Sequence, residues 1–121
     1  METVLIVEDD LDIANLIAIR LRRHGYATLT AANGAEAVTV FERARPRVIV
    51  TDWSMPVLSG LEMCALIRGS ECEPQPYVIM VTARGHASDR FDAEAAGVND
   101  YLAKPISFPD LLERVDAAFA A

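Results

Sequence analysis

The sequence lacks any long apolar segment. No stretch of its 121 residues approaches the roughly 20 consecutive apolar residues that a membrane-spanning helix needs. The opening Met1-Glu2-Thr3 is followed by only four apolar residues, so the basic start and long apolar centre of a signal peptide are missing. We therefore expect a cytoplasmic protein that does not bind membranes.

Basic residues are fewer than acidic ones, 11 against 18, and no block of like charge occurs. An acidic chain repels the phosphates of nucleic acids and anionic lipids, so we expect no direct nucleic acid binding. An apolar share of 52% argues against intrinsic disorder. A chain of this length supports one domain with a real core but not two, so residues 1–121 are predicted to form a single domain.

Cysteine is scarce as well. Cys64 and Cys72 form neither a close metal-binding pair nor the framework of a disulfide-rich protein. We expect two free thiols in a reducing compartment, and a disulfide between them is the alternative.

Short apolar runs alternate with amphipathic stretches along the chain. The runs predict strands at 3–7, 27–31, 48–51, 77–82 and 99–103, and the amphipathic stretches predict helices at 11–23, 35–45, 58–68, 89–96 and 108–120. Such alternation implies right-handed crossovers and helices on both faces of a parallel sheet. The sequence predicts an α/β fold, a doubly wound (βα)5 five-stranded sheet in the common strand order 2-1-3-4-5.

Carboxylates follow two of these strands at the point where each strand ends. Glu8 and Asp9 come after the first run, and Asp52 follows the third, shortly before Pro56, which cannot continue a strand. The carboxyl ends of parallel strands meet at one edge, where such sheets bind ligands. Carboxylates this close repel one another, and a divalent cation relieves the repulsion. Oxygen ligands favour Mg²⁺, Mn²⁺ or Ca²⁺ over zinc, and we predict Mg²⁺. Taken alone, the acidic loop Glu8-Asp9-Asp10 would be interpreted as ordinary solvated surface, and it is the presence of Asp52 on a neighbouring strand that favours a metal site.

Two other strands end in groups that bind phosphate. Thr82 ends the fourth predicted strand and Lys104 follows the fifth. With Mg²⁺ they would surround a phosphoryl group, whose transfer depends on positioning and charge neutralisation. A carboxylate can accept that group as an acyl phosphate, and Asp52 is the predicted acceptor. Taken singly, Thr82 is equally a strand-end cap and Lys104 an ordinary surface lysine.

Together these motifs resemble the receiver domains of two-component response regulators. The resemblance rests on Asp52-Trp53-Ser54-Met55-Pro56, on Gly60 eight residues after Asp52, on Thr82-Ala83 and on Asp100-Tyr101-Leu102-Ala103-Lys104-Pro105. It covers essentially the whole chain, and the motifs occur in the order and at the spacings of the family.

The resemblance implies a flavodoxin-like fold and a signalling switch. It implies no enzymatic activity other than Mg²⁺-dependent phosphorylation and dephosphorylation of the domain itself. Asp52 would take a phosphoryl group from a phosphohistidine on a sensor histidine kinase or phosphotransfer protein, and the domain would then control an output domain or a downstream partner. Glu8, Asp9, Asp52 and the backbone carbonyl of Ser54 would hold Mg²⁺, for which Mn²⁺ can substitute.

The resemblance also assigns the parts of a switch. Lys104 would pair with the phosphoryl group, and its bond to Pro105 is expected to be cis. Thr82 would move toward the phosphate and Tyr101 would swing inward.

Two positions depart from the family pattern, and two others lie where the family varies. Glu8 stands where aspartate is common, so this ligand would act through water or be replaced by Asp10. Ser59 stands where another aspartate is usual and is expected to alter only a turn. Ser54 and Arg84 occupy positions at which the family tunes hydrolysis of the acyl phosphate.

Three other classes of protein fit less well. A haloacid-dehalogenase-like phosphatase needs a second aspartate two residues after its nucleophile, and Ser54 stands there. A flavodoxin-like electron carrier would bind a phosphate after the first strand, where Glu8 and Asp9 would repel it. A receiver-like scaffold that is never phosphorylated should lack a site residue, and none is missing.

The resemblance also suggests a phosphorylation-dependent homodimer. Four charged residues match positions through which many receivers form crossed salt bridges: Arg90, Asp100, Asp110 and Arg114. Glu94 stands beside them where an apolar residue would help, so ordinary solvated charges are the alternative. Near the acceptor, we expect the ring of Trp53 to be partly exposed. His24 and His86 match no motif and are expected to be structural or solvated.

Overall fold

A five-stranded parallel sheet organises the computed structural model, which describes residues 2–121. The elements are β1 (Thr3–Val7), α1 (Leu11–Arg23), β2 (Ala27–Ala31), α2 (Gly34–Ala44), β3 (Val48–Asp52), α3 (Gly60–Gly69), β4 (Tyr77–Thr82), α4 (Ala87–Ala95), β5 (Asp100–Ala103) and α5 (Phe108–Ala120). The strand order is β2-β1-β3-β4-β5, so the predicted fold class and topology are confirmed.

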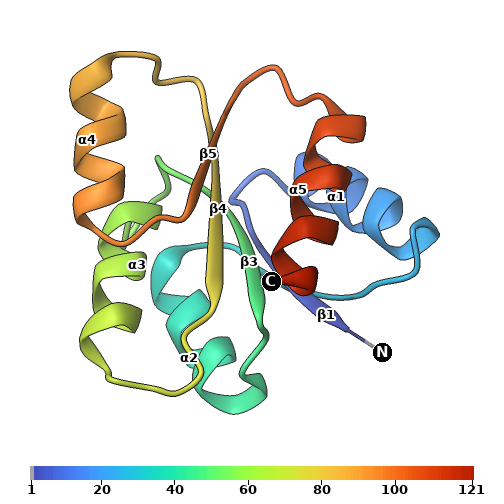
Figure 1. The fold of residues 1–121 in the computed structure, drawn as a ribbon, viewed down its shortest axis with the longest axis horizontal. Coiled ribbons are helices and arrows are strands. Elements are labelled where there is room, and N and C mark those ends of the chain that lie inside the picture. The colour runs from blue at the N-terminus through green and yellow to red at the C-terminus, as the bar shows by residue number, and fades with distance from the viewer. Residues whose placement is uncertain (1) are drawn as a thin grey trace.

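Helices cover both faces of the sheet (Figure 1). Leu5, Ile49 and Met80 belong to the core on the face covered by α2, α3 and α4. Ile6 and Ile79 belong to the core that α1 and α5 cover on the other face. Because helices cover both faces, the inner strands β1, β3 and β4 are nearly continuous buried apolar runs, whereas the edge strand β2 alternates with threonine and is less buried.

Side-chain caps fix where most helices begin. The Asp10 carboxylate accepts hydrogen bonds from the backbone N–H groups of Asp12 and Ile13 at the start of α1. Ser59 and Glu62 form a capping box at the start of α3, which explains why that helix begins at Gly60 and not at the predicted position 58. Helix α4 differs, because His86 precedes it and makes no side-chain capping bond in the part of the chain that the structure describes.

Other predicted boundaries differ by one or two residues. Strand β3 extends through Asp52 because its register with β4 continues to the pairing of Asp52 with Val81. Helix α4 begins at Ala87, two residues before the prediction, and α2 begins at Gly34 behind its Asn33 cap. Asp52, the predicted acceptor, is thus the last residue of a central strand.

The two cysteines are free thiols buried in the core, as predicted. Their burial raises the pKa of the Cys64 thiol, which keeps it protonated. No helix within residues 2–121 has both the length and the apolar character needed to span a bilayer.

Candidate metal and phosphoryl site

Three carboxylates meet at the carboxyl edge of the sheet. Strands β1 and β3 are neighbours, with Val7 opposite Thr51, so the residues that follow them converge. One oxygen each from Glu8, Asp9 and Asp52 lies within 4.8 Å of the others. Glu8 is buried, Asp9 is exposed and Asp52 is intermediate. The cluster offers oxygen ligands only, the donor set that Mg²⁺ prefers.

Lys104 is the only lysine of the sequence, and it points into this cluster. Its Nζ lies 3.2 Å from Asp52 Oδ2 and 3.7 Å from Glu8 Oε1. Burial disfavours the ammonium, but the hydrogen bond to Asp52 and the charges of Asp52 and Glu8 outweigh it and raise the pKa of Lys104. A positive charge therefore faces the Asp52 carboxylate.

Glu8 is the most perturbed acid of the site. Its side chain is only 5% exposed. Burial raises its pKa to about 7, helped by the charge of Asp52 and opposed by a hydrogen bond from the backbone N–H of Asp10. Burial, with the neighbouring charge of Asp52, thus favours the protonated form of this carboxyl.

Hydrogen bonds hold both the side chain and the backbone of Asp52. Its side-chain Oδ1 accepts a 2.7 Å hydrogen bond from the backbone N–H of Trp53. Its carbonyl accepts a 2.8 Å bond from the hydroxyl of Thr51. Helix α3 starts so close that a Cβ on Gly60 would lie 2.0 Å from this carbonyl oxygen, so only glycine fits there. These contacts orient the Asp52 carboxylate toward the carboxyl edge of the sheet.

The predicted switch residues lie on strands β4 and β5, next to the strand that carries Asp52 or one strand beyond it. Thr82 is buried at the end of β4, and its hydroxyl accepts a 3.1 Å bond from the backbone N–H of Arg84. The hydroxyl of Tyr101 donates to the carbonyl of Arg84. The Lys104–Pro105 bond is cis, as the resemblance implies. Ser54 is exposed directly after the Asp52–Trp53 pair.

The expectation for Trp53 is wrong. The ring is 6% exposed, because the Arg84 guanidinium lies 4.5 Å above it and the Tyr101 ring meets it edge-on at 6.5 Å. Arg84 is also held by Asp89, 3.8 Å away, and by the Ser54 hydroxyl, 3.5 Å away. Sequence spacing gave no sign of this stacking, since Trp53 and Arg84 come from different loops.

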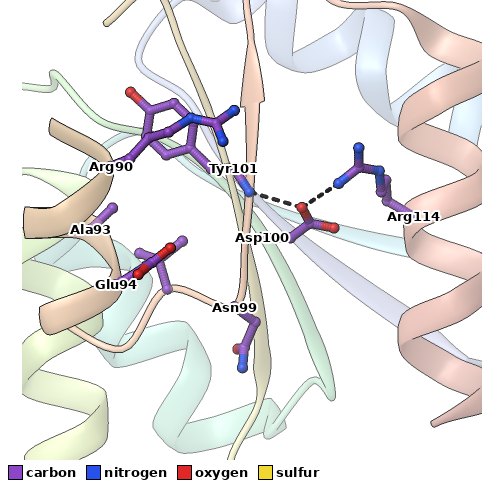
Figure 2. Close-up of a pocket in the computed structure, with 8 residues that line it drawn as sticks. Arg90, Ala93, Glu94, Asn99, Asp100, Tyr101 and Arg114 are labelled. Atoms are coloured by element: carbon purple, nitrogen blue, oxygen red, sulfur yellow. Dashed lines mark hydrogen bonds and ion pairs between the residues drawn. The ribbon is translucent and has the colours of Figure 1, made fainter. Parts of the chain in front are cut away.

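Three of the four charged residues assigned to a dimer interface, Arg90, Asp100 and Arg114, line a cavity of about 210 Å³ between α4 and α5 (Figure 2). Asp100 accepts hydrogen bonds from Arg114 and from the backbone N–H of Tyr101. Arg114 also lies 3.4 Å from Asp110, and Arg90 stacks over the Tyr101 ring at 5.0 Å. Three of the groups predicted to pair across two chains, Asp100, Asp110 and Arg114, are thus paired within one chain.

Neither histidine lies near the acidic cluster. His24 Nε2 lies 2.9 Å from an oxygen of Asp116, and the hydroxyl of Tyr26 donates to the same carboxylate, so His24 is structural as expected. His86 is exposed before α4.

Comparison with known proteins places the chain in a family. Residues 4–116 match the model of the response regulator receiver domain. The chain belongs to this family. Receiver domains are signalling switches of two-component systems, which is the class that the sequence motifs predicted.

Relatives and solved structures agree with this assignment. The receiver domain is 37% identical to a probable transcriptional regulator ycf27 of Cyanophora paradoxa, over 93% of this chain and 46% of that protein. It is 36% identical to the phosphate regulon transcriptional regulatory protein PhoB of Rhizobium meliloti, over 94% of this chain and 50% of that protein. It thus spans about half the length of these relatives.

Two solved structures share the fold over nearly the whole chain. The receiver domain of the Francisella response regulator 1452 superposes with a TM-score of 0.93 at 30% identity, covering 99% of this chain and 98% of that one. Chemotaxis protein CheY4 of Vibrio cholerae superposes with a TM-score of 0.91 at 30% identity, covering 98% of each chain.

Proposed function

We propose that Asp52 is the phosphoryl acceptor of a two-component switch. The observation that carries the proposal is the placement of its carboxylate, with one oxygen held by the Trp53 N–H and the other facing Lys104 at 3.2 Å. The first contact orients the nucleophile, and the second supplies positive charge where the phosphoryl oxygens would lie. The carboxylate is half-buried, which leaves it open to a donor.

The residues of the site fit a bound Mg²⁺, with Mn²⁺ as a substitute. Glu8, Asp9 and Asp52 each present a carboxylate oxygen within 4.8 Å of the others. Burial raises the pKa of Glu8, and the negative charge of Asp52 adds to this shift. Asp9 and Asp52 would hold the ion, with the Ser54 carbonyl, while buried Glu8 would act directly or through water. When bound, Mg²⁺ neutralises charge on the phosphoryl oxygens.

In the transfer step, an oxygen of the Asp52 carboxylate attacks the phosphorus atom of the donor. The O–P bond of an acyl phosphate forms as the P–N bond to a histidine of a sensor kinase or phosphotransfer protein breaks, and the bonding electrons leave with the imidazole. Lys104 stays protonated, because its raised pKa lies far above neutrality. Its role is electrostatic and it transfers no proton.

The donor would dock beside the acceptor on α1. This helix begins next to Glu8 and Asp9, and it exposes three large apolar side chains that its packing does not need: Leu11, Leu16 and Ile19. Such a stripe fits the apolar face of a partner helix. The phosphorylated domain would then act on an output domain or a downstream protein through Thr82 and Tyr101, in the cytoplasm and without contacting nucleic acid itself.

Intact-mass spectrometry tests the acceptor. With Mg²⁺ and acetyl phosphate, the wild-type domain should gain the mass of one phosphoryl group, and a chelator should prevent the gain. The Asp52→Asn variant should remain unmodified, while Asp110→Asn, a matched change of an acid on α5, should be labelled like the wild type. Equal labelling of Asp52→Asn would refute the proposal.

A further inference from the structure

Arg68 makes an unusual set of contacts at the edge of the sheet opposite the acidic site. Its Nη1 donates to the Gln75 side chain and to the Pro76 carbonyl, both at 2.8 Å. Its Nε and Nη2 donate to the Gly97 carbonyl at 3.0 and 2.8 Å, and Nη2 also reaches Asn99 Oδ1 at 2.7 Å. One side chain from the last turn of α3 thus binds both the loop before β4 and the loop between α4 and β5.

These contacts hold the C-terminal end of α4. The helix ends at Ala95 with Ala96 as its C-cap, and Gly97 turns the chain with a φ of +97°, so its carbonyl faces the guanidinium. A Cβ on residue 97 would lie 2.6 Å from Arg68 Cγ, which shows how closely the two segments pack. Asn99 continues the connection, since its Oδ1 also accepts a 2.8 Å bond from the Val78 N–H.

The two ends of α4 are fastened very differently. Near the C-terminal end, Ala93 and Val98 are buried, and the Val98 N–H donates to the Ala93 carbonyl. At the N-terminal end no side chain caps the helix within the described chain, and the large Phe91 side chain in the middle of the helix is 71% exposed. That end is held by surface contacts, namely Asp89 to Arg84 and Arg90 over the Tyr101 ring.

We propose that Arg68 is a clamp that fixes the C-terminal end of α4, so that the helix responds to phosphorylation by moving its N-terminal end about this point. The contacts of the N-terminal end pass through Arg84 and Tyr101, which lie beside Thr82 and the acceptor, whereas the clamp touches neither. A change at Asp52 therefore reaches one end of the helix only. The direction of the motion rests on the proposed function, but the clamp itself does not.

Arginine is required because the clamp uses a planar fork with donors on all three nitrogens. The acceptors are two backbone carbonyls and two side-chain amide oxygens, spread around the guanidinium plane. A lysine ammonium is a single point with three donors and cannot reach both loops. Its positive charge alone would not preserve the connection.

Amide hydrogen exchange on the unphosphorylated domain tests the clamp. In Arg68→Ala, and also in Arg68→Lys, exchange at the Val78, Val98 and Asn99 amides should accelerate by about tenfold or more relative to amides in β1 and β3. Arg43→Ala, which removes an exposed arginine from α2, should leave these rates unchanged. Unchanged exchange in Arg68→Lys, or acceleration that is uniform across the sheet, would overturn the clamp.

The same measurement with Mg²⁺ and beryllofluoride, a phosphoryl mimic, tests the motion. In the wild type, exchange should change at residues 84–91 and stay constant at 96–99, and in Arg68→Lys the change should spread to 96–99. A wild-type change equally large at both ends would overturn the pivot. Fluorine NMR reports separately whether beryllofluoride binds at all, so a failure of the phosphorylation proposal is distinguished from a failure of the clamp.

Discussion

Glu8 links the acidic site to the pH dependence of folding. Its folded pKa of about 7 lies above its ordinary value of 4.5, so the folded chain keeps a proton that the unfolded chain loses as pH rises from 4.5 to 7. Without metal, the free energy of unfolding should fall over this window, by about 2–3 kcal/mol, and level off above it. Glu8→Gln should remove the fall, which urea titrations between pH 5 and 8 measure.

A control separates this effect from general titration of the acidic chain. Glu113 is exposed on α5, so Glu113→Gln should show the same pH dependence as the wild type. A Glu8→Gln variant that loses stability as steeply as the wild type over this window would mean that Glu8 ionises normally. Excess Mg²⁺ should weaken the slope in the wild type, because the ion stabilises the charged carboxylate.

Val57 is a strained residue in the loop that follows Asp52. Its φ is +70°, in the left-handed region that a β-branched residue rarely adopts, and its side chain is 81% exposed. Asparagine tolerates this backbone and loses no buried contact. Val57→Asn should therefore raise the free energy of unfolding by about 1 kcal/mol, whereas Val57→Ile, which keeps the branch, should leave it unchanged. If Val57→Asn were less stable than the wild type in chemical denaturation, the valine side chain would make a contact that stabilises the fold by more than the backbone strain destabilises it.

Residues such as Val57 and Trp53 show where sequence reasoning stops. The acceptor, the acidic pair, Thr82 and Lys104 were found because each ends an apolar run, and parallel strands bring their ends together. The burial of Trp53 depends on Arg84, which reaches it from another loop. A contact between two loops produces no periodic pattern in the sequence from which the burial of a residue could be predicted.

At the scale of elements, the close approach of α3 to β3 determines where Asp52, the proposed acceptor, lies. Gly60→Ala would place a Cβ 2.0 Å from the Asp52 carbonyl and 2.9 Å from the Thr51 hydroxyl, and backbone cannot yield cheaply. We expect a loss of about 2–4 kcal/mol in thermal or chemical unfolding and slower labelling by acetyl phosphate.

Gly69 offers a matched control in the same helix. A Cβ at this position would meet nothing within 4 Å, so Gly69→Ala should be neutral or stabilise by up to about 1 kcal/mol. If both substitutions had similar effects, the helix would tolerate displacement and α3 would not position Asp52.

The elements differed in how well they could be predicted. Strands and helices that bury one clear face were located to within a residue or two, because burial sets their pattern. Helix starts depended on caps such as Ser59 with Glu62, which shift the first residue without changing the pattern. The unequal anchoring of α4 was not predictable, since the acceptors of Arg68 lie 7 to 31 residues away in the sequence.

At the scale of the whole molecule, the charges between α4 and α5 bear on assembly. Asp100 and Arg114 are already paired within the chain, so a symmetric dimer through these residues gains little that the monomer lacks. We expect sedimentation velocity to show a monomer both without and with Mg²⁺ and beryllofluoride. A dimer on activation that Asp100→Arg abolishes and the further change Arg114→Asp restores would show instead that these pairs exchange between chains.

The central claim is that one carboxylate, at the end of β3, receives the phosphoryl group. The most direct test is to phosphorylate the domain with acetyl phosphate and Mg²⁺, reduce the acyl phosphate with borohydride and sequence the peptides by tandem mass spectrometry. Reduction converts a phosphorylated aspartate to homoserine and leaves free carboxylates intact. The account predicts homoserine at position 52 alone. Homoserine at position 9 or 10, or a phosphoryl group on a hydroxyl or imidazole that borohydride does not remove, would contradict it.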